Sequence, residues 1–171
     1  FAAELAARHA ELAKMAAQES KDSSLLADRL SIAPTSLMYY EDVHKTEFES
    51  TVISCMSTSQ HPDASHIIIL AETCFYPEGG GQAPDIGFIT SSGKNVNVLD
   101  VQKEGDIVLH LTDGPISDDA NVTGVIDASR RRQLMDHHTA VHIVGGASRR
   151  LLGPHIFQAG SNVTVEYARL D

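Results

Sequence analysis

The sequence predicts an α+β fold in which helices flank a run of short strands. Residues 1–31 are Ala-rich, and their apolar side chains recur with helical spacing. Residues 37–126 consist of short β-type runs separated by turn residues. An uninterrupted helical pattern then covers residues 128–152 and stops at Gly153-Pro154.

The composition is that of a globular protein and excludes several classes. The 171 residues carry a formal charge of −10, and 42% of them are apolar. The longest apolar runs are far shorter than the roughly 18–20 residues that cross a bilayer, so no membrane segment is expected. Two Cys cannot build a disulfide framework, and no secretory signal opens the chain, which favours a cytoplasmic protein. Because the first residue is Phe1, we expect a piece of a longer protein.

The first two expected units are a helical linker and a barrel. The linker covers residues 1–36, and Pro34 ends its helix. Six short strands with such spacing are typical of a small β-barrel, which we place at residues 37–127. The expected strands cover residues 48–54, 66–70, 87–90, 96–101, 106–111 and 120–126.

A third unit is expected over residues 128–171. Asp127 is the expected N-cap of its long helix. The loop at residues 155–161 would return a polar group to this helix, and the alternating run at 162–167 predicts a final strand. Since the chain stops straight after that strand, we expect this unit to be cut short.

One face of the long helix carries two histidines. Leu134, His138, Val141 with His142, and Gly145 share this face, and the two imidazoles lie one helical turn apart. Such a pair suits two ligands of one tetrahedral Zn²⁺, although a surface or structural His pair has the same spacing. It is not a metalloprotease motif, because Thr139 occupies the position of the catalytic Glu.

The segment from Thr73 to Gln82 is the most unusual in the chain. Its three consecutive Gly are costly in any regular element, so they indicate a tight path or a close approach of the backbone to a ligand. Thr73 and Gln82 supply neutral hydrogen-bonding groups, which orient a small polar substrate or a water without adding charge. A plain hairpin connection is the alternative.

A basic segment interrupts the acidic chain. Residues 128–152 contain five Arg and one Asp, a local charge of 5 − 1 = +4. Such a segment predicts a phosphate-facing patch, with an Arg-rich solvated helix face as the alternative. The candidates for contact with nucleic acid are Arg130, Arg131, Arg132, Arg149 and Arg150.

Four motifs stand out along the chain. They are TCFYPEGGGQ at residues 73–82 with Asp-Ile-Gly at 85–87, HTAVH at 138–142, HIFQAGS at 155–161 and YARLD at 167–171. Together they resemble the editing region of alanyl-tRNA synthetases of the archaeal type, and the related free-standing alanyl-tRNA editing proteins. The resemblance implies a barrel similar to the second domain of translation elongation factors, then the start of an α+β editing core shared with threonyl-tRNA synthetases.

The resemblance also implies a chemistry. This family hydrolyses the ester that joins serine or glycine to alanine tRNA. The implied partners are therefore alanine tRNA and the serine or glycine that it carries. It implies His138 and His142 as Zn²⁺ ligands, Thr73 as the hydroxyl-recognising group and Gln82 as a substrate- or water-positioning group. Two further ligands, a Cys and a His, would come later in the family's chains, so only two of four are present here. ATP and Mg²⁺ would act only in a catalytic domain elsewhere.

Two alternatives stay open at this point. The piece could be a non-catalytic tRNA-binding or scaffold module, because its metal site is incomplete. Apolar surface left by truncation could also drive formation of a homodimer.

Overall fold

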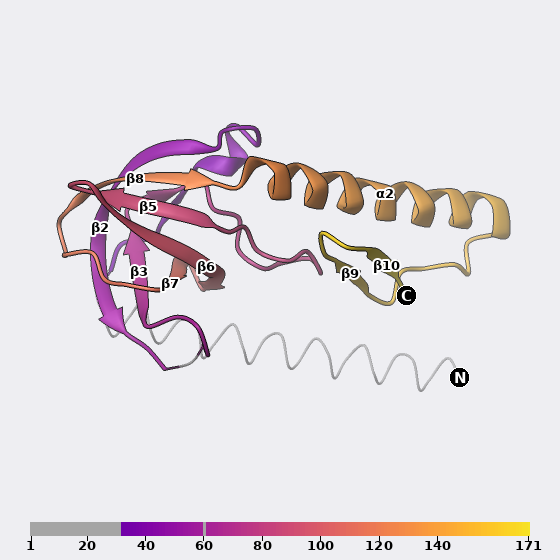
Figure 1. Cartoon of the computed structure of the whole chain (residues 1–171). Coiled ribbons are helices and arrows are strands. Elements are labelled where there is room, and N and C mark those ends of the chain that lie inside the picture. The colour runs from indigo at the N-terminus through magenta and orange to yellow at the C-terminus, as the bar shows by residue number, and fades with distance from the viewer. Residues whose placement is uncertain (1–31, 60) are drawn as a thin grey trace.

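The computed structural model of the chain describes residues 32–59 and 61–171. The expected helical lead-in over residues 1–31 lies outside these residues. In the described part, a six-stranded barrel leads directly into one long α-helix, which extends away from the barrel above a small hairpin (Figure 1). The elements are β1 (Ser36–Leu37), η1 (Met38–Tyr40), β2 (Glu47–Ser57), β3 (His66–Leu70), β4 (Glu72–Thr73), β5 (Gly87–Ser91), β6 (Lys94–Glu104), β7 (Ile107–Thr112), β8 (Asn121–Ile126), α2 (Ala128–Leu152), β9 (Ser161–Val163) and β10 (Ala168–Leu170).

The barrel closes in the order β2-β3-β7-β6-β5-β8, and every pair of neighbours is antiparallel. All six strands predicted from the sequence are confirmed, with ends that differ by a few residues. The alternation of β2 and β8 fits a wall with one face inside, whereas β7 is buried along its whole length. Irregular register near Val52 in β2 and near Val98 in β6 marks where these long strands bend around the barrel.

Two hydrophobic clusters explain why β3 and β7 are buried on both faces. The larger cluster fills the barrel and includes Phe48, Ile68 and Phe75. The smaller includes Ile67 and Ile69, which alternate with Ile68 and therefore lie on the opposite face of β3. Thus the barrel is covered as well as filled along this part of its wall.

The long helix α2 is confirmed over the residues that the sequence predicted. Asp127 is the N-cap, and its carboxylate accepts a hydrogen bond from the Arg130 backbone N–H at 3.0 Å. Gly153 ends the helix with φ +116°, a conformation that favours glycine. Among the described residues no helix is long and apolar enough to cross a membrane.

The final strand predicted at residues 162–167 is wrong, because the chain turns within it. Thr164 makes the turn: its hydroxyl accepts hydrogen bonds from the N–H groups of Glu166 and Tyr167, both at 3.2 Å. The result is a hairpin of β9 and β10 rather than one strand. A small cluster of Leu134, Val141 and Val163 packs α2 against this hairpin, and Gln133 Nε2 donates a hydrogen bond to the Val165 carbonyl at 2.6 Å.

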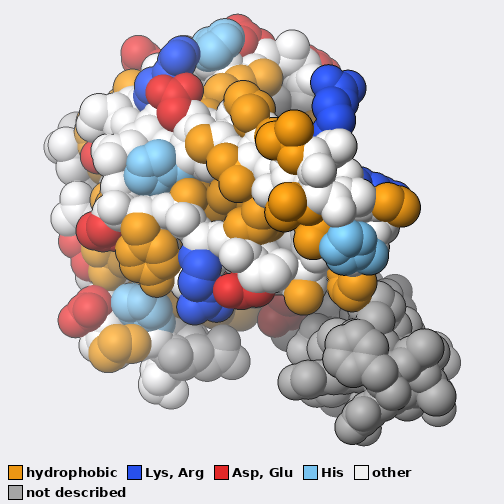
Figure 2. Space-filling view, turned by 90° about the vertical axis from the view of Figure 1, so that its right-hand side faces the viewer, with side chains coloured by type: hydrophobic (Ala, Val, Ile, Leu, Met, Phe, Trp, Pro, Cys, Tyr) orange, Lys and Arg blue, Asp and Glu red, His pale blue; other side chains and the backbone are white. Residues whose placement is uncertain are grey.

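The outer part of α2 leaves apolar side chains exposed. Figure 2 looks at the end of the molecule where α2 stops and shows hydrophobic side chains gathered there. The large ones on α2 are Ile143, Val144, Leu151 and Leu152, which are between 54% and 82% exposed. The outer part of α2 therefore buries its apolar side chains much less completely than the barrel does.

Candidate functional site

The two histidines of α2 form a stacked pair. The ring centroids of His138 and His142 lie 4.9 Å apart, with 21° between the ring planes. The two residues lie one helical turn apart, so both side chains are on the same face of α2. His138 is half-buried and His142 is exposed.

The structure brings Gln82 to this pair. The Gln82 side chain is buried, and its Oε1 lies 2.8 Å from Nδ1 of His138. With the amide oxygen facing the ring, Nδ1 carries the proton and donates it to the hydrogen bond. The lone pair of Nε2 is therefore left available to a ligand. Residues 56 positions apart in the sequence thus form one polar array.

Burial lowers the pKa of His138, and the neighbouring His142 lowers it further. Both effects disfavour the imidazolium. At neutral pH the His138 ring is accordingly the neutral form, which is the form that accepts a proton or binds a metal.

The Gly-rich segment follows a tight path because another strand lies against it. Gly80 and Gly81 have φ values of +60° and +79°, and a Cβ on Gly81 would overlap the carbonyl oxygen of Ser161 in β9. Backbone bonds join the segments: the Val163 N–H donates to Gly81 O at 2.7 Å, and the Ala83 N–H donates to Val163 O at 2.9 Å. The close approach predicted from the glycines is made by β9, and it fixes Gln82 beneath α2.

Thr73 does not lie in the array of Gln82 and the two histidines. It is fully buried, and its hydroxyl lies 2.9 Å from Nε2 of His110 and accepts from the Phe75 N–H at 3.1 Å. His110 in turn donates from Nδ1 to the Ile68 carbonyl at 2.9 Å, so its Nε2 accepts the Thr73 proton. Complete burial lowers the pKa of His110 to about 4, with the bond to Ile68 opposing part of this shift. The structure therefore places Thr73 in a buried network of the barrel.

Arg131 does not lie on the surface, where the expected basic patch requires it. Its guanidinium is buried and forms a salt bridge with Asp85, and it also donates to the carbonyls of Val43 and Cys74. Asp85 is itself buried and accepts from the Tyr76 N–H at 2.7 Å. Since the guanidinium is buried and each of its three nitrogens donates inside the protein, Arg131 is not available to a phosphate. Its observed position joins the first turn of α2 to the segment that carries Gln82.

The other four arginines of the expected patch lie in different environments. Arg130 is half-buried and donates from Nε to the Pro84 carbonyl at 3.1 Å. Arg132 makes an exposed i,i+4 pair with Asp136 at 2.9 Å. Arg149 and Arg150 are exposed near the far end of the helix. The five residues therefore do not form one continuous patch.

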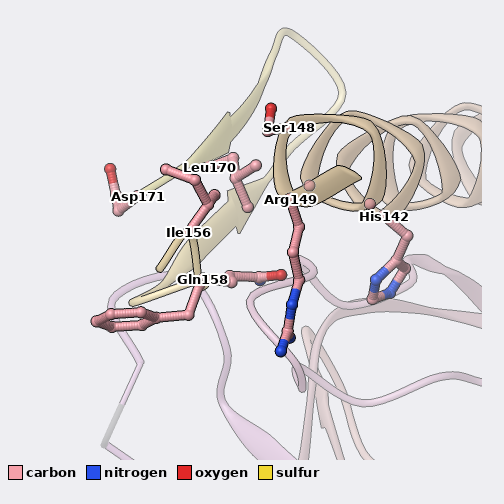
Figure 3. A pocket seen from close by; sticks show the side chains of 10 residues that line it. His142, Ser148, Arg149, Ile156, Gln158, Leu170 and Asp171 are labelled. Carbon is pink, nitrogen blue, oxygen red and sulfur yellow. The ribbon is translucent and has the colours of Figure 1, made fainter. Parts of the chain in front are cut away.

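A cleft of about 380 Å³ opens beside His142. It lies between the outer turns of α2, the loop before β9 and the end of β10 (Figure 3). The sequence reasoning missed this cleft, although it expected the loop at residues 155–161 to return a polar group to the helix, and Gln158 does so. Its lining residues are His142, Gly145, Gly146, Ser148, Arg149, Ile156, Phe157, Gln158, Leu170 and Asp171.

The described residues supply only part of a metal site. Within residues 32–59 and 61–171 no group of three or more His, Cys, Asp or Glu side chains is arranged to hold one. His138 and His142 fit as two nitrogen ligands, and a structural zinc needs four ligands. The described residues therefore supply half of a tetrahedral set.

Comparison with known proteins identifies the family. A family model described as "tRNA synthetases class II (A)" matches residues 1–130. The chain belongs to this family. The match to the class II (A) synthetases covers the barrel and the Gly-rich segment and ends in the first turn of α2.

Curated relatives cover the remaining segment as well. The alanine–tRNA ligases of Natronomonas pharaonis and Thermofilum pendens are each 41% identical to this class II synthetase chain over 98% and 99% of its length, and 18% of theirs. That of Ignicoccus hospitalis is 44% identical over 81% of the chain and 14% of its own length. The chain thus spans less than a fifth of the length of these archaeal relatives.

Proposed function

We propose that this chain is part of an alanyl-tRNA synthetase and belongs to the module that hydrolyses mischarged Ser-tRNA or Gly-tRNA for alanine, in the cytoplasm. The observation that carries the proposal is the array of Gln82, His138 and His142, assembled from two distant segments beside a cleft. In this proposal, alanine attachment with ATP and Mg²⁺ takes place elsewhere in the longer protein. The names of the relatives support the synthetase part, and the array supports the hydrolytic part.

Neutral hydrogen-bonding groups suit the removal of a wrong amino acid. A synthetic site shaped for the methyl group of alanine rejects an added hydroxyl only weakly, which is why such enzymes need a second, hydrolytic site. Ester hydrolysis adds one water across the acyl–oxygen bond and releases the amino acid and the ribose hydroxyl. The Nε2 lone pair of His138 is oriented by Gln82 to hold a ligand or to accept a proton at that atom.

Zinc enters the proposal through the histidines alone. His138 and His142 would hold it, with the Gln82 oxygen fixing the tautomer of His138, as outer groups commonly do for metal-bound imidazoles. When bound, zinc would orient the substrate or lower the pKa of a bound water. Because the described residues supply two ligands only, no step of the proposal is routed through the metal.

The role of Thr73 in this proposal follows from its burial. Its hydroxyl proton is donated to His110, and one lone pair accepts from the Phe75 N–H. We assign it to fixing the start of the segment that carries Gln82. Direct recognition of a serine hydroxyl is the alternative, and it requires the side chain to leave His110.

A non-catalytic tRNA-binding or scaffold module is the second candidate. It is favoured by one observation, the half-complete set of metal ligands in the described residues. In that case Gln82 would serve only to fix the geometry of α2.

The test is deacylation of serine-charged alanine tRNA, with bound zinc counted per polypeptide. The 171-residue chain is assayed by itself and within a polypeptide of the length of its relatives. We expect the longer polypeptide to hydrolyse the ester, and Gln82→Leu to slow it about 10- to 100-fold, in the range seen when a partner of a metal-bound imidazole is lost.

Gln133→Leu is the matched control, because Gln133 is exposed on the same helix and its amide donates to the Val165 carbonyl. We expect it to leave the rate within about twofold, as surface changes generally do. If neither polypeptide hydrolyses the ester, the scaffold interpretation replaces the editing one.

A further inference from the structure

We propose that a groove between η1, the Gly-rich segment and the first turns of α2 binds a small, neutral, planar aromatic molecule that accepts a hydrogen bond. This tyrosine groove is lined by Tyr39, Tyr40 and Tyr76 together with Gln82, and its volume is about 180 Å³. It shares no lining residue with the cleft beside His142. The proposal does not depend on the editing function.

The three tyrosines supply flat walls. The ring centroid of Tyr39 lies 4.8 Å from that of Tyr40 and 5.2 Å from that of Tyr76, with interplanar angles of 54° and 66°. Because the rings are inclined to one another, an added planar ring can pack against the face of one and the edge of another. Tyr40 is 75% exposed, and Val43 and Met135 complete the apolar lining. The walls of the groove therefore favour an aromatic ligand.

The amide of Gln82 has an unused donor. Gln82 is only 5% exposed, its Oε1 is bonded to His138, and its Nε2 has no hydrogen-bond partner within residues 32–59 and 61–171. In this part of the chain, no completely buried side-chain nitrogen or oxygen lacks a partner, so Nε2 reaches open space. The tyrosine groove supplies such space, because Gln82 lines it. An acceptor in the groove would satisfy this donor.

The hydroxyl of Tyr39 is a second unused donor. Tyr39 is 6% exposed, and its Oη has no hydrogen-bond partner in the described part of the chain. Burial raises the pKa of Tyr39 and that of Tyr76, so both phenols keep their protons at neutral pH. A phenol and an amide nitrogen both donate. The matching ligand therefore carries an acceptor such as a carbonyl oxygen or a ring nitrogen.

The charges and the size of the groove narrow the ligand further. Among the described residues that line it, Arg131 alone is charged, and its guanidinium is already paired with Asp85. Neither a phosphate nor an ammonium group would find a partner there, so a neutral molecule is favoured. An apolar cavity of about 150 Å³ holds one benzene ring. The groove of about 180 Å³ therefore suits one ring with a small substituent.

A ligand in the groove would act on the histidine pair through Gln82. The side-chain amide is planar, so an acceptor bonded to Nε2 holds Oε1 in the orientation that accepts the proton of His138. His138 itself is not part of the groove lining. The tyrosine groove is thus a place where a small molecule would stabilise one tautomer of His138 without contacting its ring.

The test uses benzamide, a neutral planar ring with a carbonyl acceptor. Its binding to the 171-residue chain is followed by ¹⁵N–¹H NMR of the Gln82 side-chain amide. We expect benzamide to shift this signal at millimolar concentration, because a molecule of about nine non-hydrogen atoms binds weakly. Cyclohexanecarboxamide lacks the flat ring and toluene lacks the acceptor. Each should bind at least about fivefold more weakly than benzamide.

Two variants probe the groove, each with a matched control. Val43→Trp places a large side chain at the rim, where Val43 is 42% exposed, and should weaken benzamide binding at least about tenfold by occupying the space. Ile53→Trp introduces the same side chain outside the lining, at a position that is 39% exposed. Tyr40→Ala removes one wall and should weaken binding about two- to tenfold. Its control is Tyr167→Ala, which removes an exposed tyrosine from the turn between β9 and β10.

Both controls should bind benzamide within about twofold of the unchanged chain, and circular dichroism of all four variants checks that the fold is kept. The proposal is overturned if benzamide leaves the Gln82 amide signal unchanged, or if Val43→Trp binds benzamide as tightly as the unchanged chain. Equal binding of toluene and benzamide would also overturn it, because the groove would then collect any apolar molecule. Since no tRNA or ester enters this test, its outcome is independent of the deacylation assay.

Discussion

The barrel buries its apolar surface much more completely than the arm does, where the arm is α2 with the hairpin of β9 and β10. The barrel has two clusters of buried hydrophobic residues, and its strands close on themselves. The arm buries only Leu134, Val141 and Val163 as a cluster and leaves Ile143, Val144, Leu151 and Leu152 exposed. The polar groups with a proposed chemical role lie on the arm or face it.

This difference shows how stability and chemistry are separated in the molecule. A closed sheet has no free edges and holds its polar groups in internal networks, such as Thr73 with His110. The outer part of α2 keeps His142, Arg149 and Arg150 exposed because little is packed over them. The buried Arg131–Asp85 pair is a joint between the two, because it links the first turn of α2 to the segment that carries Gln82.

Breaking that joint should have the largest effect. Arg131→Met leaves the Asp85 carboxylate buried without its partner, and we expect the free energy of unfolding to fall by about 3–5 kcal/mol, measured by urea denaturation. Arg131→Met combined with Asp85→Leu should cost less than the sum of the two single changes, by about 1–3 kcal/mol, since the two residues are in direct contact.

An exposed pair on the same helix provides the control. Arg132→Met removes the partner of Asp136, and we expect it to cost less than about 1 kcal/mol because both side chains are more than half exposed. If Arg131→Met and Arg132→Met lowered the free energy of unfolding equally, the Arg131–Asp85 pair would not be a joint between α2 and the barrel.

Acid should affect the barrel through His110. Its pKa is about 4 in the folded chain, below the ordinary value of 6.5. Between these values the unfolded chain binds the extra proton, so stability is fully present above pH 6.5 and is lost as the pH falls toward 4. The loss should reach about 3 kcal/mol for this group.

Urea midpoints at pH 7.5 and 4.5 measure this loss, and His110→Gln should remove that part of the pH dependence. An NMR titration of the His110 ring is the direct check. A ring pKa near 6.5 would show that the barrel does not bury it as the structure indicates.

Substitutions of Gly146 and Gly81 by Ala should change the free energy of unfolding least, and in opposite directions. Gly146→Ala should raise the free energy of unfolding by about 0.5–1 kcal/mol, because the helix gains a better former and nothing clashes. Gly81→Ala should lower it by more than about 1 kcal/mol, because its φ is +79° and its Cβ would overlap Ser161. Thermal unfolding of both variants measures this, and a destabilising Gly146→Ala would contradict the open space at that position.

The regular elements could be predicted because their signals are local. Alternation and turn residues predict the six barrel strands, and the N-cap Asp127 with Gly153-Pro154 predicts α2. The final strand was missed because the Thr164 hydroxyl turns the chain, and the alternating pattern of residues 162–167 does not show this.

The site was harder to predict because its parts meet through tertiary packing. The sequence singled out Gln82, His138 and His142 separately, but only the fold shows the bond between Gln82 and His138. Arg131 was grouped with its neighbours by charge, although it lies three residues before Leu134 and so shares the buried face of α2. That spacing was the signal that separates it from Arg132.

Closure of the barrel also sets an order of events when the chain folds. Its last seam pairs Glu47 with Val125, which lie 125 − 47 = 78 residues apart, and such distant pairing forms slowly. The helix begins at Ala128, just after this seam, and its Arg131 reaches back to Asp85. We therefore expect the histidines of α2 to take their place over Gln82 after β8 has docked, because the helix begins two residues after that strand ends.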